Sequence, residues 1–355
     1  MDPEERKYFS RQIKLPFLGE PGQEKLRASS ALVIGLGGLG SPASLHLATA
    51  GIGKIGLWDF DTIELSNLHR QTAFTLSDLG KRKTDITAQF LTARVPGLKT
   101  EIFHEVFGDP IDEARFDAWD IILDCTDQVP AKYAINRLAH RKKKPFVTAS
   151  VFRTSAQISI FSPEGKPCYK CLYPDLDGSD LLSCAEGGVL GIQTAIAGMY
   201  QASLAIQYLL FPERSPTRSS FQIEWESPLV YEVEIQADPH CTVCGEVKTT
   251  SSIPKEEITF SEWISLQEDP NTVLLDIREL KETLEFPISN SIFFPLSKID
   301  DADFSPFSKN KIYIAVCESG MRSKRAARIL QEKGFKSYSL QGGRRVLRQE
   351  QIKTS

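Results

Sequence analysis

The stretch Ala31-Leu32-Val33-Ile34-Gly35-Leu36-Gly37-Gly38-Leu39-Gly40 decides the fold of the first part of the chain. Its four leading apolar residues predict a strand that is buried on both faces. Ser41-Pro42-Ala43 then predicts a helix start, because serine caps helices and proline fits the first turn. The glycines match G-x-G-x-x-G at Gly35, Gly37 and Gly40, in the strand–turn–helix context that the pattern requires. We therefore expect backbone N–H groups at this turn to approach a bound phosphate.

Strands and helices continue to alternate beyond this turn. Gly51 is placed to end the first helix, and residues 55–58, 121–123 and 146–148 form short runs typical of strands. A helical pattern that extends to Lys142 separates the last two runs. This alternation predicts an α/β fold, a Rossmann-like domain with a mainly parallel sheet.

Charged residues around the glycine turn bear on which nucleotide it binds. Asp59 ends the second predicted strand, about 20 residues beyond the turn, where a ribose-binding carboxylate belongs. Taken alone, this pattern leaves open a dinucleotide site or a tight turn without a ligand. ATP is favoured by Arg70, Lys83 and Asp127, because cations neutralise a triphosphate and a carboxylate can hold Mg²⁺. Arg11 is a further candidate phosphate cation.

Several segments resemble the MoeB/ThiF family, the bacterial-type relatives of ubiquitin-activating E1 enzymes, in order over roughly residues 5–245. They are Arg11-Gln12-Ile13, Gly35-x-Gly37-Gly38-Leu39-Gly40, Asp59-Phe60-Asp61, Ser66-Asn67-Leu68-x-Arg70-Gln71, Lys83 and Asp124-Cys125-Thr126-Asp127. The resemblance implies an E1-type ATP-binding domain. It also implies that the chain adenylates the C-terminal Gly-Gly carboxylate of a small ubiquitin-like sulfur carrier protein.

The same resemblance implies roles for single residues. Asp59 would bind ribose, Asp127 would work with Mg²⁺, and the phosphates would be surrounded by Asn67, Arg70 and Lys83. The glycines at the phosphates would be Gly35, Gly37, Gly38 and Gly40. Arg11 would come from a second subunit, which implies a homodimer. The chain departs from the family at Gln128, usually Asn, and at Lys132, usually Arg, so we expect altered affinity for ATP or for the carrier tail.

Four of the seven cysteines form two C-x-x-C pairs, Cys168-Tyr169-Lys170-Cys171 and Cys241-Thr242-Val243-Cys244. Four thiolates can close a tetrahedral structural Zn²⁺ site. In a protein without export signals, metal is favoured over two disulfides or a redox pair. The predicted ligands are therefore Cys168, Cys171, Cys241 and Cys244, and the MoeB/ThiF resemblance also places zinc at this pattern.

Two further cysteines differ in their surroundings. Cys125 lies in a predicted strand and is expected in the core. Cys184 lies among small residues and glycines, which predict a mobile loop before a long helix. It could attack an acyl-adenylate and form a thioester, as in E1-like enzymes, or it could be a loop cysteine without a covalent role.

Cys317 is the strongest candidate nucleophile. It follows a predicted strand, Ile312-Tyr313-Ile314-Ala315-Val316, and precedes a predicted helix that includes residues 324–330. Backbone N–H groups and the positive end of a helix would stabilise an anionic persulfide there, and Arg322 adds a cation. The alternative is an inert core cysteine at the end of a strand.

The loop around this cysteine, Cys317-Glu318-Ser319-Gly320-Met321-Arg322-Ser323, resembles the active loop of a rhodanese domain. Leu274-Leu275-Asp276-Ile277-Arg278-Glu279 is similar to the start of that domain and Gly342-Gly343 to its end. The segment Phe286-Pro287-Ile288 departs from the usual Gly-His-Ile, and the usual aromatic after the double glycine is missing. Neither departure touches the loop, so sulfurtransferase activity is expected.

Composition and charge define the remaining expectations. A length of 355 residues predicts two domains, which we place at 1–245 and 255–355 with a polar linker at 246–254. A net charge of −4 favours neither nucleic acid nor an anionic membrane as a partner. The charged N-terminus and the polar residues within 195–211 argue against export and against a membrane span. Free reactive thiols predict a reducing, cytoplasmic location.

The two predicted halves form one reaction sequence. ATP with Mg²⁺ would adenylate the carrier, and a Cys317 persulfide, charged by a cysteine desulfurase or thiosulfate, would convert the adenylate to a thiocarboxylate. Molybdopterin, thiamine and tRNA thiolation pathways all share this chemistry. Two alternatives are a dinucleotide-dependent oxidoreductase with an accessory sulfurtransferase domain and a binding scaffold without turnover.

Overall fold

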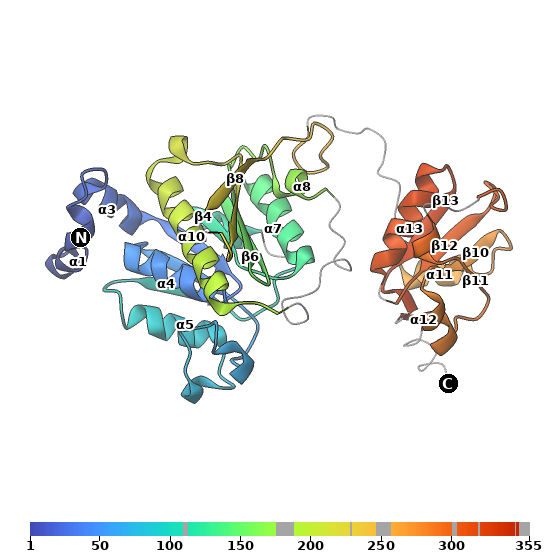
Figure 1. The fold of residues 1–355 in the computed structure, drawn as a ribbon, viewed down its shortest axis with the longest axis horizontal. Helices are drawn as coiled ribbons and strands as arrows, with labels where there is room; N and C mark the ends of the chain where they lie inside the picture. The colour runs from blue at the N-terminus through green and yellow to red at the C-terminus, as the bar shows by residue number, and fades with distance from the viewer. Residues whose placement is uncertain are drawn as a thin grey trace. The chain divides into compact units, whose positions relative to one another are not determined.

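A computed structural model describes residues 1–108, 113–174, 188–227, 229–245, 257–299, 304–318, 320–344 and 346–347. The described residues up to 245 form one compact unit, and those from 257 onward form a second (Figure 1). The predicted linker at 246–254 and the predicted loop around Cys184 lie outside the described residues.

The first unit is built on an eight-stranded mixed sheet in the order β3-β2-β1-β4-β5-β6-β7-β8. The strands are β1 Ser30–Ile34, β2 Lys54–Trp58, β3 Lys99–Phe103, β4 Ile121–Asp124, β5 Phe146–Phe152, β6 Ser155–Phe161, β7 Ser219–Glu224 and β8 Val230–Glu234. Neighbouring strands from β3 to β5 pair in parallel, and those from β5 to β8 pair antiparallel. The prediction of a mainly parallel α/β sheet is therefore confirmed.

Helices cover both faces of this sheet (Figure 1). They are α1 Pro3–Tyr8, α2 Ser10–Ile13, α3 Gly19–Ala28, α4 Gly40–Ala50, α5 Lys83–Thr92, α6 Ala114–Asp117, α7 Val129–Lys142, α8 Tyr169–Leu172 and α10 Gly191–Leu210, with short 3₁₀ helices η1 Leu65–Asn67, η2 Leu76–Asp78 and η3 Pro212–Arg214. In β1, Ala31 and Val33 pack with the core that includes α4, α5 and α10. Leu32 and Ile34 pack with the core that includes α6, α7 and α8. Burial on both faces explains the unbroken apolar run of this strand.

The start of α4 differs from the sequence prediction by two residues, because a Ser41 cap would place the first helical residue at Pro42. The helix begins at Gly40, so Ser41 lies inside the first turn and makes no capping hydrogen bond. The hydroxyl of Ser41 is buried without a hydrogen-bond partner among the described residues. The other end is as predicted, because Gly51 adopts the left-handed conformation, φ +104°, that ends many helices.

The second unit is a five-stranded parallel sheet in the order β11-β10-β12-β13-β9. Its elements are β9 Glu257–Ile258, α11 Phe260–Leu266, β10 Thr272–Asp276, α12 Leu280–Glu285, β11 Ser291–Phe293, η4 Leu296–Lys298, β12 Ile312–Val316, α13 Met321–Glu332 and β13 Lys336–Leu340. Ala326 and Leu330 of α13 pack against one face of the sheet, and Trp263 of α11 packs against the other. The predicted strand and helix that flank Cys317 are β12 and α13.

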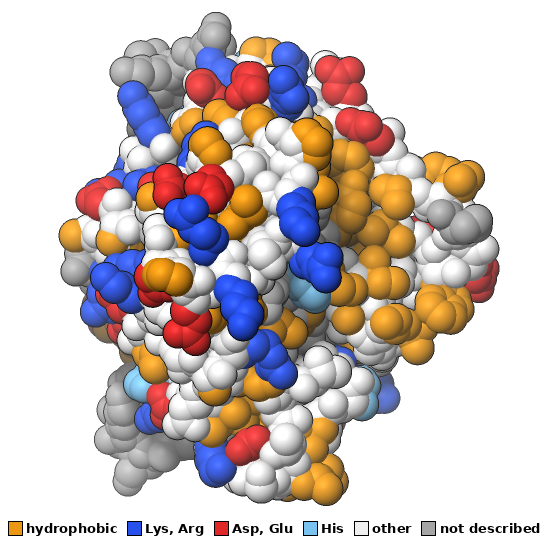
Figure 2. All heavy atoms as spheres, turned by 90° about the vertical axis from the view of Figure 1, so that its left-hand side faces the viewer, with side chains coloured by type: hydrophobic (Ala, Val, Ile, Leu, Met, Phe, Trp, Pro, Cys, Tyr) orange, Lys and Arg blue, Asp and Glu red, His pale blue; other side chains and the backbone are white. Residues whose placement is uncertain are grey.

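The surface on the side of α1 and α3 carries both signs of charge, and hydrophobic side chains gather on part of it (Figure 2). Exposed large hydrophobic residues near the N-terminus are Tyr8, Leu15 and Phe17. No helix among the described residues is long and apolar enough to cross a membrane. Residues 195–210 belong to α10 of the first unit, in which Ala197, Leu204 and Ala205 are among the buried side chains.

Candidate active sites and metal centre

Three neighbouring strands end at the same edge of the first sheet. Gly35, Asp59 and Asp127 follow β1, β2 and β4, which lie side by side in the order β2-β1-β4 and run parallel. The carboxyl ends of parallel strands are where nucleotides bind in open α/β sheets. The structure thus brings the predicted glycine turn and two of the predicted carboxylates to one edge.

Two glycines of the turn are required by the backbone itself. Gly35 has φ +89°, and a Cβ there would lie 2.8 Å from the carbonyl oxygen of Cys125. A Cβ on Gly40 would lie 1.8 Å from the carbonyl oxygen of Gly35. No side chain fits at either position, so the turn from β1 into α4 needs both glycines before any ligand is considered.

Gly37 and Gly38 have different surroundings. A Cβ on Gly37 would meet only the Nε2 atom of Gln71, at 3.8 Å, so this position stays open to an approaching ligand. A Cβ on Gly38 would lie 2.7 Å from Oγ1 of Thr194 in α10. Gly38 therefore has a packing reason that the sequence pattern did not indicate, and its role toward phosphate stays a prediction.

Asp59 is buried and tied to the glycine turn. Its carboxylate accepts hydrogen bonds from the N–H of Leu36 at 2.6 Å and from the N–H of Asp61 at 2.8 Å. Burial raises the pKa of Asp59, and the nearby Lys83 ammonium partly opposes that shift. The acid is held at the end of β2 in a fixed orientation, as a ribose-binding group must be.

The predicted phosphate ligands are all paired within the chain. Lys83, at the start of α5, is 5% exposed and donates to Oδ2 of Asp61 at 2.8 Å. Asn67 is buried, and its side-chain oxygen accepts from the N–H of Glu64 at 3.1 Å. Arg70 donates to the carbonyl oxygen of Ser66 at 2.7 Å. These contacts fix the side chains near the turn, and an anion could replace the exposed Asp61 as the partner of Lys83.

Gln71 is a candidate binding residue that sequence reasoning missed. It is 2% exposed, and its side-chain oxygen has no hydrogen-bond partner among the described residues. Its amide nitrogen lies beside the open position at Gly37. A buried amide oxygen without a partner is uncommon and points to a missing donor. The only signal in the sequence was its place beside Arg70 in the motif.

Asp127 is exposed at the end of β4, in a short loop that a buried network holds. Asp124 accepts from Thr126 Oγ1 at 2.7 Å and from Lys132 Nζ at 3.0 Å. Lys132 is 4% exposed and also donates to the carbonyl oxygen of Ala149 at 2.8 Å. Lys132 is thus an internal anchor of the loop before Asp127, whereas Gln128 is exposed and makes no capping bond to α7.

Arg11 is exposed on α2, at the end of α4 that is remote from the glycine turn. The neighbouring Gln12 donates to the carbonyl oxygen of Ala50, the last residue of α4, at 3.4 Å. The glycine turn lies at the opposite end of this helix, which has 11 residues and is therefore about 16 Å long. The structure does not bring Arg11 to the glycine turn of its own chain.

The four cysteines of the C-x-x-C pairs come together at one point. The sulfur atoms of Cys168, Cys171, Cys241 and Cys244 all lie within 4.8 Å of one another. The S–S distances are 3.6 Å between Cys168 and Cys241 and 3.3 Å between Cys171 and Cys244. Four sulfurs about 2.3 Å from a zinc ion lie about 3.8 Å apart, so the cluster fits Zn²⁺.

The surroundings of the cluster also suit a cation. Asn136 donates to Cys168 at 3.6 Å and the N–H of Asp238 donates to Cys171 at 3.5 Å, as second-sphere groups do at thiolates. Burial and the neighbouring thiols raise the pKa of Cys168 to about 12, so this sulfur needs a cation to become a ligand. The cluster joins the start of α8 to residues 241–244, and zinc would fix these two segments together.

Cys125 is buried beneath the glycine turn and donates to the side-chain oxygen of Gln201 at 3.4 Å. Burial raises its pKa far above the ordinary value, so it is a core thiol, as the sequence indicated. Cys184 lies outside the described residues, and its thioester role stays a prediction.

Cys317 sits at the end of β12, and its thiol is 0% exposed. The sulfur accepts a hydrogen bond from the N–H of Gly320 at 3.1 Å and contacts Ser323 Oγ at 3.4 Å. Gly343 closes the other side of the loop, because a Cβ there would lie 2.4 Å from the carbonyl oxygen of Cys317. The strand–loop–helix setting that the sequence predicted is present, with one N–H among the described residues aimed at the sulfur.

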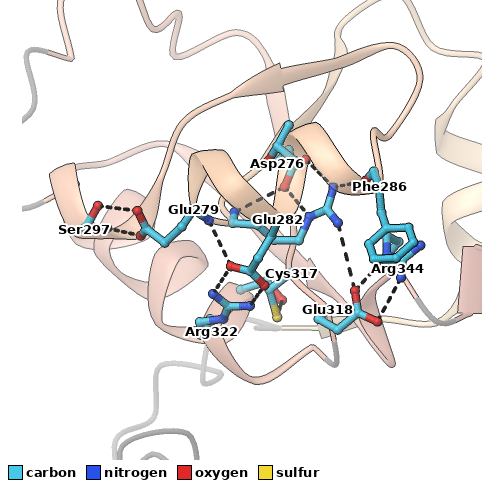
Figure 3. A network of polar contacts seen from close by, with 12 residues as sticks. Asp276, Glu279, Glu282, Phe286, Ser297, Cys317, Glu318, Arg322 and Arg344 are labelled. Atoms are coloured by element: carbon cyan, nitrogen blue, oxygen red, sulfur yellow. Dashed lines mark hydrogen bonds and ion pairs between the residues drawn. The ribbon is translucent and has the colours of Figure 1, made fainter.

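Arg322, the cation that the sequence predicted beside this sulfur, is paired with a carboxylate. It forms a two-pronged ion pair with Glu282 of α12, at 2.8 and 2.6 Å (Figure 3). This contact with Arg322 holds the pKa of Glu282 below its usual range and raises the pKa of Arg322. The sequence expectation of an added positive charge is therefore modified, since a carboxylate neutralises it.

A second arginine–carboxylate pair lies on the other side of the loop. Glu318, next to Cys317, accepts from Arg344 at 2.7 and 3.1 Å. Arg278 lies within 4.0 Å of the same carboxylate and is itself fully buried against Asp276 (Figure 3). Sequence reasoning missed both pairs, because their members lie on different elements.

Comparisons with known proteins agree with this geometry. A model described as "ThiF family" matches residues 9–243, and one described as "Rhodanese-like domain" matches residues 259–349. The chain is 30% identical to adenylyltransferase and sulfurtransferase MOCS3 of Danio rerio, over 91% of this chain and 80% of that protein. It is 31% identical to adenylyltransferase and sulfurtransferase uba4 of Aspergillus niger, over 98% of this chain and 84% of that protein.

A solved structure shares the fold of the first unit. The crystal structure of E. coli MccB with ATP covers 69% of this chain, and the chain covers 75% of it, with a TM-score of 0.58 at 24% identity. The chain therefore belongs to the ThiF family, carries a rhodanese-like domain after the ThiF region, and is an adenylyltransferase and sulfurtransferase.

Proposed function

We propose that this enzyme adenylates the C-terminal Gly-Gly carboxylate of a small ubiquitin-like sulfur carrier protein and then converts it to a thiocarboxylate with sulfur from Cys317. The observation that carries the proposal is the pairing in one chain of a nucleotide-type sheet edge with a hydrogen-bonded cysteine loop. A carboxylate accepts sulfur poorly, because oxide is a very poor leaving group. Adenylation makes AMP the leaving group instead.

The adenylation step needs positioning and charge stabilisation more than covalent chemistry. Asp59 would hold the ribose of ATP, and the open position at Gly37 would admit the phosphates. Asn67, Arg70 and Lys83 would surround those phosphates. When bound, Mg²⁺ would neutralise phosphate charge, and Asp127 would hold it.

The sulfur step begins from a persulfide on Cys317. Its outer sulfur attacks the acyl carbon, a C–S bond forms, and AMP leaves with the electrons of the C–O bond. The product is an acyl disulfide. A thiol reductant then attacks the Sγ atom of Cys317, which releases the carrier thiocarboxylate and leaves a disulfide between Cys317 and the reductant. Persulfides are strong nucleophiles, so no strong general base is required.

Cys184 is proposed as an acyl acceptor that acts before the persulfide: its thiolate would displace AMP to form a thioester, and the Cys317 persulfide would then displace the Cys184 thiolate in place of AMP. The chain that follows Cys184 supports the idea, because residues 188–190 are fixed near the site. The N–H of Arg153 donates to the carbonyl oxygen of Gly188 at 3.2 Å, and the N–H of Leu190 donates back to Arg153 at 3.0 Å. A Cβ on Gly191 would lie 2.8 Å from the carbonyl oxygen of His69, one residue before Arg70.

The enzyme is proposed to act as a homodimer in which Arg11 serves the partner's nucleotide site. The position of Arg11 at the far end of α4 supports a role in trans. A hollow of about 330 Å³ on the same side, lined by Gln12, His46 and Met199 among others, offers a surface for a second copy. Sedimentation of the full chain should give twice the monomer mass, and Arg11→Ala should keep that mass while losing adenylation.

The partners follow from this chemistry. They are a carrier that ends in Gly-Gly and a sulfur donor, either a cysteine desulfurase or thiosulfate. The zinc ion is proposed to be structural, because four cysteines fill its coordination sphere. We place the enzyme in the cytoplasm, because its reactive thiols need a reducing compartment.

Adenylation is tested by carrier-dependent exchange of pyrophosphate into ATP. Gly-Gly-ending carriers recovered with a Cys317→Ala variant, which keeps the adenylation site, provide the substrate. Exchange should require the intact carrier terminus and should be lost with a carrier that lacks its last glycine. Absence of exchange with every recovered carrier, or binding of NAD(H) in place of ATP, would contradict the proposal and favour the oxidoreductase reading.

Sulfur transfer is tested by intact-mass measurement. Wild type incubated with a sulfane sulfur donor should gain one sulfur atom, and Cys317→Ala should gain none. Equal gain in both proteins would remove Cys317 from the mechanism.

A further inference from the structure

Two arginines beside the Cys317 loop are each paired with a carboxylate. Arg322 comes from α13 and pairs with Glu282 of α12 through two hydrogen bonds of 2.8 and 2.6 Å. Arg344 follows β13 and pairs with Glu318 through bonds of 2.7 and 3.1 Å. Figure 3 shows these two pairs on either side of the cysteine. The loop therefore presents arginine side chains whose anion-binding faces are already occupied.

A third arginine of this region, Arg278, is also paired with a carboxylate. Arg278 is 0% exposed and forms a two-pronged pair with Asp276 at 2.8 and 2.7 Å. Its remaining Nη1 makes no hydrogen bond to the described residues but lies at ion-pair distance, 4.0 Å, from the Glu318 carboxylate. Among the described residues, Arg278, Arg322 and Arg344 are thus paired with Asp276, Glu282 and Glu318, and Glu279 adds a further negative charge that acts on Arg322.

This pairing matters for the choice of sulfur donor, and the inference rests on the proposed sulfur transfer to Cys317. Thiosulfate carries two negative charges, and an arginine fork is the group that best binds such an oxyanion. To reach Arg322, thiosulfate must break the pair with Glu282 or place its charges beside that carboxylate. A persulfide on a cysteine carries at most one negative charge at the sulfur and needs no guanidinium.

We infer that Glu282 and Glu318 are specificity-determining residues, which make the Cys317 site discriminate against small dianionic sulfur donors in favour of an organic persulfide carried on a cysteine. With thiosulfate, the Cys317 thiolate attacks the outer sulfur, the S–S bond breaks, and sulfite leaves with the electron pair. With a cysteine persulfide, the same attack forms the Cys317 persulfide, and the donor's cysteine leaves as a thiolate. Both reactions transfer one sulfur atom without a further oxidant or reductant.

The test compares two donors on the full chain. The donors are thiosulfate and the persulfide of a cysteine peptide that is acetylated and amidated, so that it carries no other charge. The second-order rate constant of sulfur loading on Cys317 is measured by intact mass for wild type, Glu282→Gln and Glu318→Gln. Glu257→Gln is the matched control, because Glu257 also pairs with a cation of α13, Lys324 at 2.9 Å. Its side chain makes no hydrogen bond or ion pair with the described residues of the loop 317–323.

Loss of one charged pair should raise the thiosulfate rate constant about tenfold in Glu282→Gln, with a smaller rise in Glu318→Gln. The peptide rate constant should stay within about twofold of wild type in every variant. Both rate constants should be unchanged in Glu257→Gln. The unfolding midpoint of each variant is measured together with its rate constants. If either Glu282→Gln or Glu318→Gln does not fold, the thiosulfate rate constant of the other variant tests the inference.

Two results would overturn the inference. One is a thiosulfate rate constant that stays at the wild-type value in the folded glutamine variants. The other is a parallel rise for both donors, which would mean that the glutamates only restrict access. Wild type that is loaded by neither donor would instead contradict the proposed sulfur transfer itself, and the inference would fall with it.

Discussion

At the scale of single residues, the glycines of the turn from β1 into α4 are needed for two different reasons, one for folding and the other for ligand binding. A Cβ on Gly40 would collide with the carbonyl oxygen of Gly35 at 1.8 Å, whereas a Cβ on Gly37 would meet nothing closer than 3.8 Å. One sequence pattern thus contains positions with different physical reasons for glycine. Substitution by alanine can tell them apart.

Gly40→Ala should destabilise the first unit by about 3 kcal/mol, because backbone atoms must move to admit a Cβ. Gly37→Ala should change the free energy of unfolding by less than about 1 kcal/mol but weaken ATP binding at least tenfold, because the methyl group occupies the phosphate approach. Denaturant unfolding and calorimetric titration with ATP measure the two effects. Gly37→Ala that binds ATP like wild type would move the phosphates away from this turn.

Lys132 is a buried cation whose hydrogen bonds fix the loop before the exposed Asp127. Its ammonium has three partners, Asp124, Thr148 and the carbonyl oxygen of Ala149, at 3.0, 3.3 and 2.8 Å. Lys132→Met should destabilise the first unit by about 3–5 kcal/mol, because Asp124 is left as a buried charge without a cation. Lys81→Met is the control, since Lys81 pairs with Asp78 at the surface and should cost less than about 1 kcal/mol. Equal losses in chemical denaturation would mean that Asp124 is neutral or hydrated.

At the scale of elements, the cysteine cluster ties the segment at α8 to the chain that follows β8. The two pairs come from 168–171 and 241–244, and only the fold brings them within 4.8 Å. A closed four-sulfur site contributes to folding because it exists only in the folded state.

Removal of the metal is therefore expected to loosen the first unit. Cys171→Ser should lose bound zinc and lower the midpoint of thermal unfolding by about 10 °C, which corresponds to about 3 kcal/mol for a unit of this size. Metal analysis and scanning calorimetry measure both quantities. Cys125→Ala should keep one zinc per chain, because Cys125 bonds to Gln201 and not to the cluster. A zinc-free wild type, purified without chelators, would contradict the assignment.

At the scale of the whole molecule, the chain has two compact units with separate chemistry. The nucleotide-type edge uses described residues between 35 and 127, and the cysteine loop uses residues from β12, α12 and α13. No described residue belongs to both sites. The two partial reactions should therefore fail independently.

Asp127→Ala should lower carrier-dependent ATP–pyrophosphate exchange at least a hundredfold and leave sulfur loading of Cys317 within twofold of wild type. Cys317→Ala should show the opposite pattern, with normal exchange and no loading. Thiocarboxylate formation, measured by the mass of the carrier, should be lost in both. Loss of sulfur loading in a folded Asp127→Ala protein would show that the units depend on each other.

Much of the fold could be predicted from local patterns. The strand 312–316 and the end of the helix at Lys142 were predicted as the structure has them, because apolar runs and flanking residues act over a few positions. The start of α4 was predicted two residues late, because the glycine turn continues directly into the helix without a serine cap. The pairing of cysteines across a long gap was predicted from metal chemistry rather than from local structure.

The amino-acid sequence by itself determined the features that depend on residues close together in the chain. They are the glycine turn, the acids that end strands, the C-x-x-C pairs and the loop after Cys317. Only the tertiary structure decided which partners those residues have. Gly38 meets Thr194 of α10, Lys132 anchors Asp124, and Arg322 is neutralised by Glu282. These partners lie on other turns and elements, and no local pattern encodes such a contact, because it forms only when separate elements pack on one sheet.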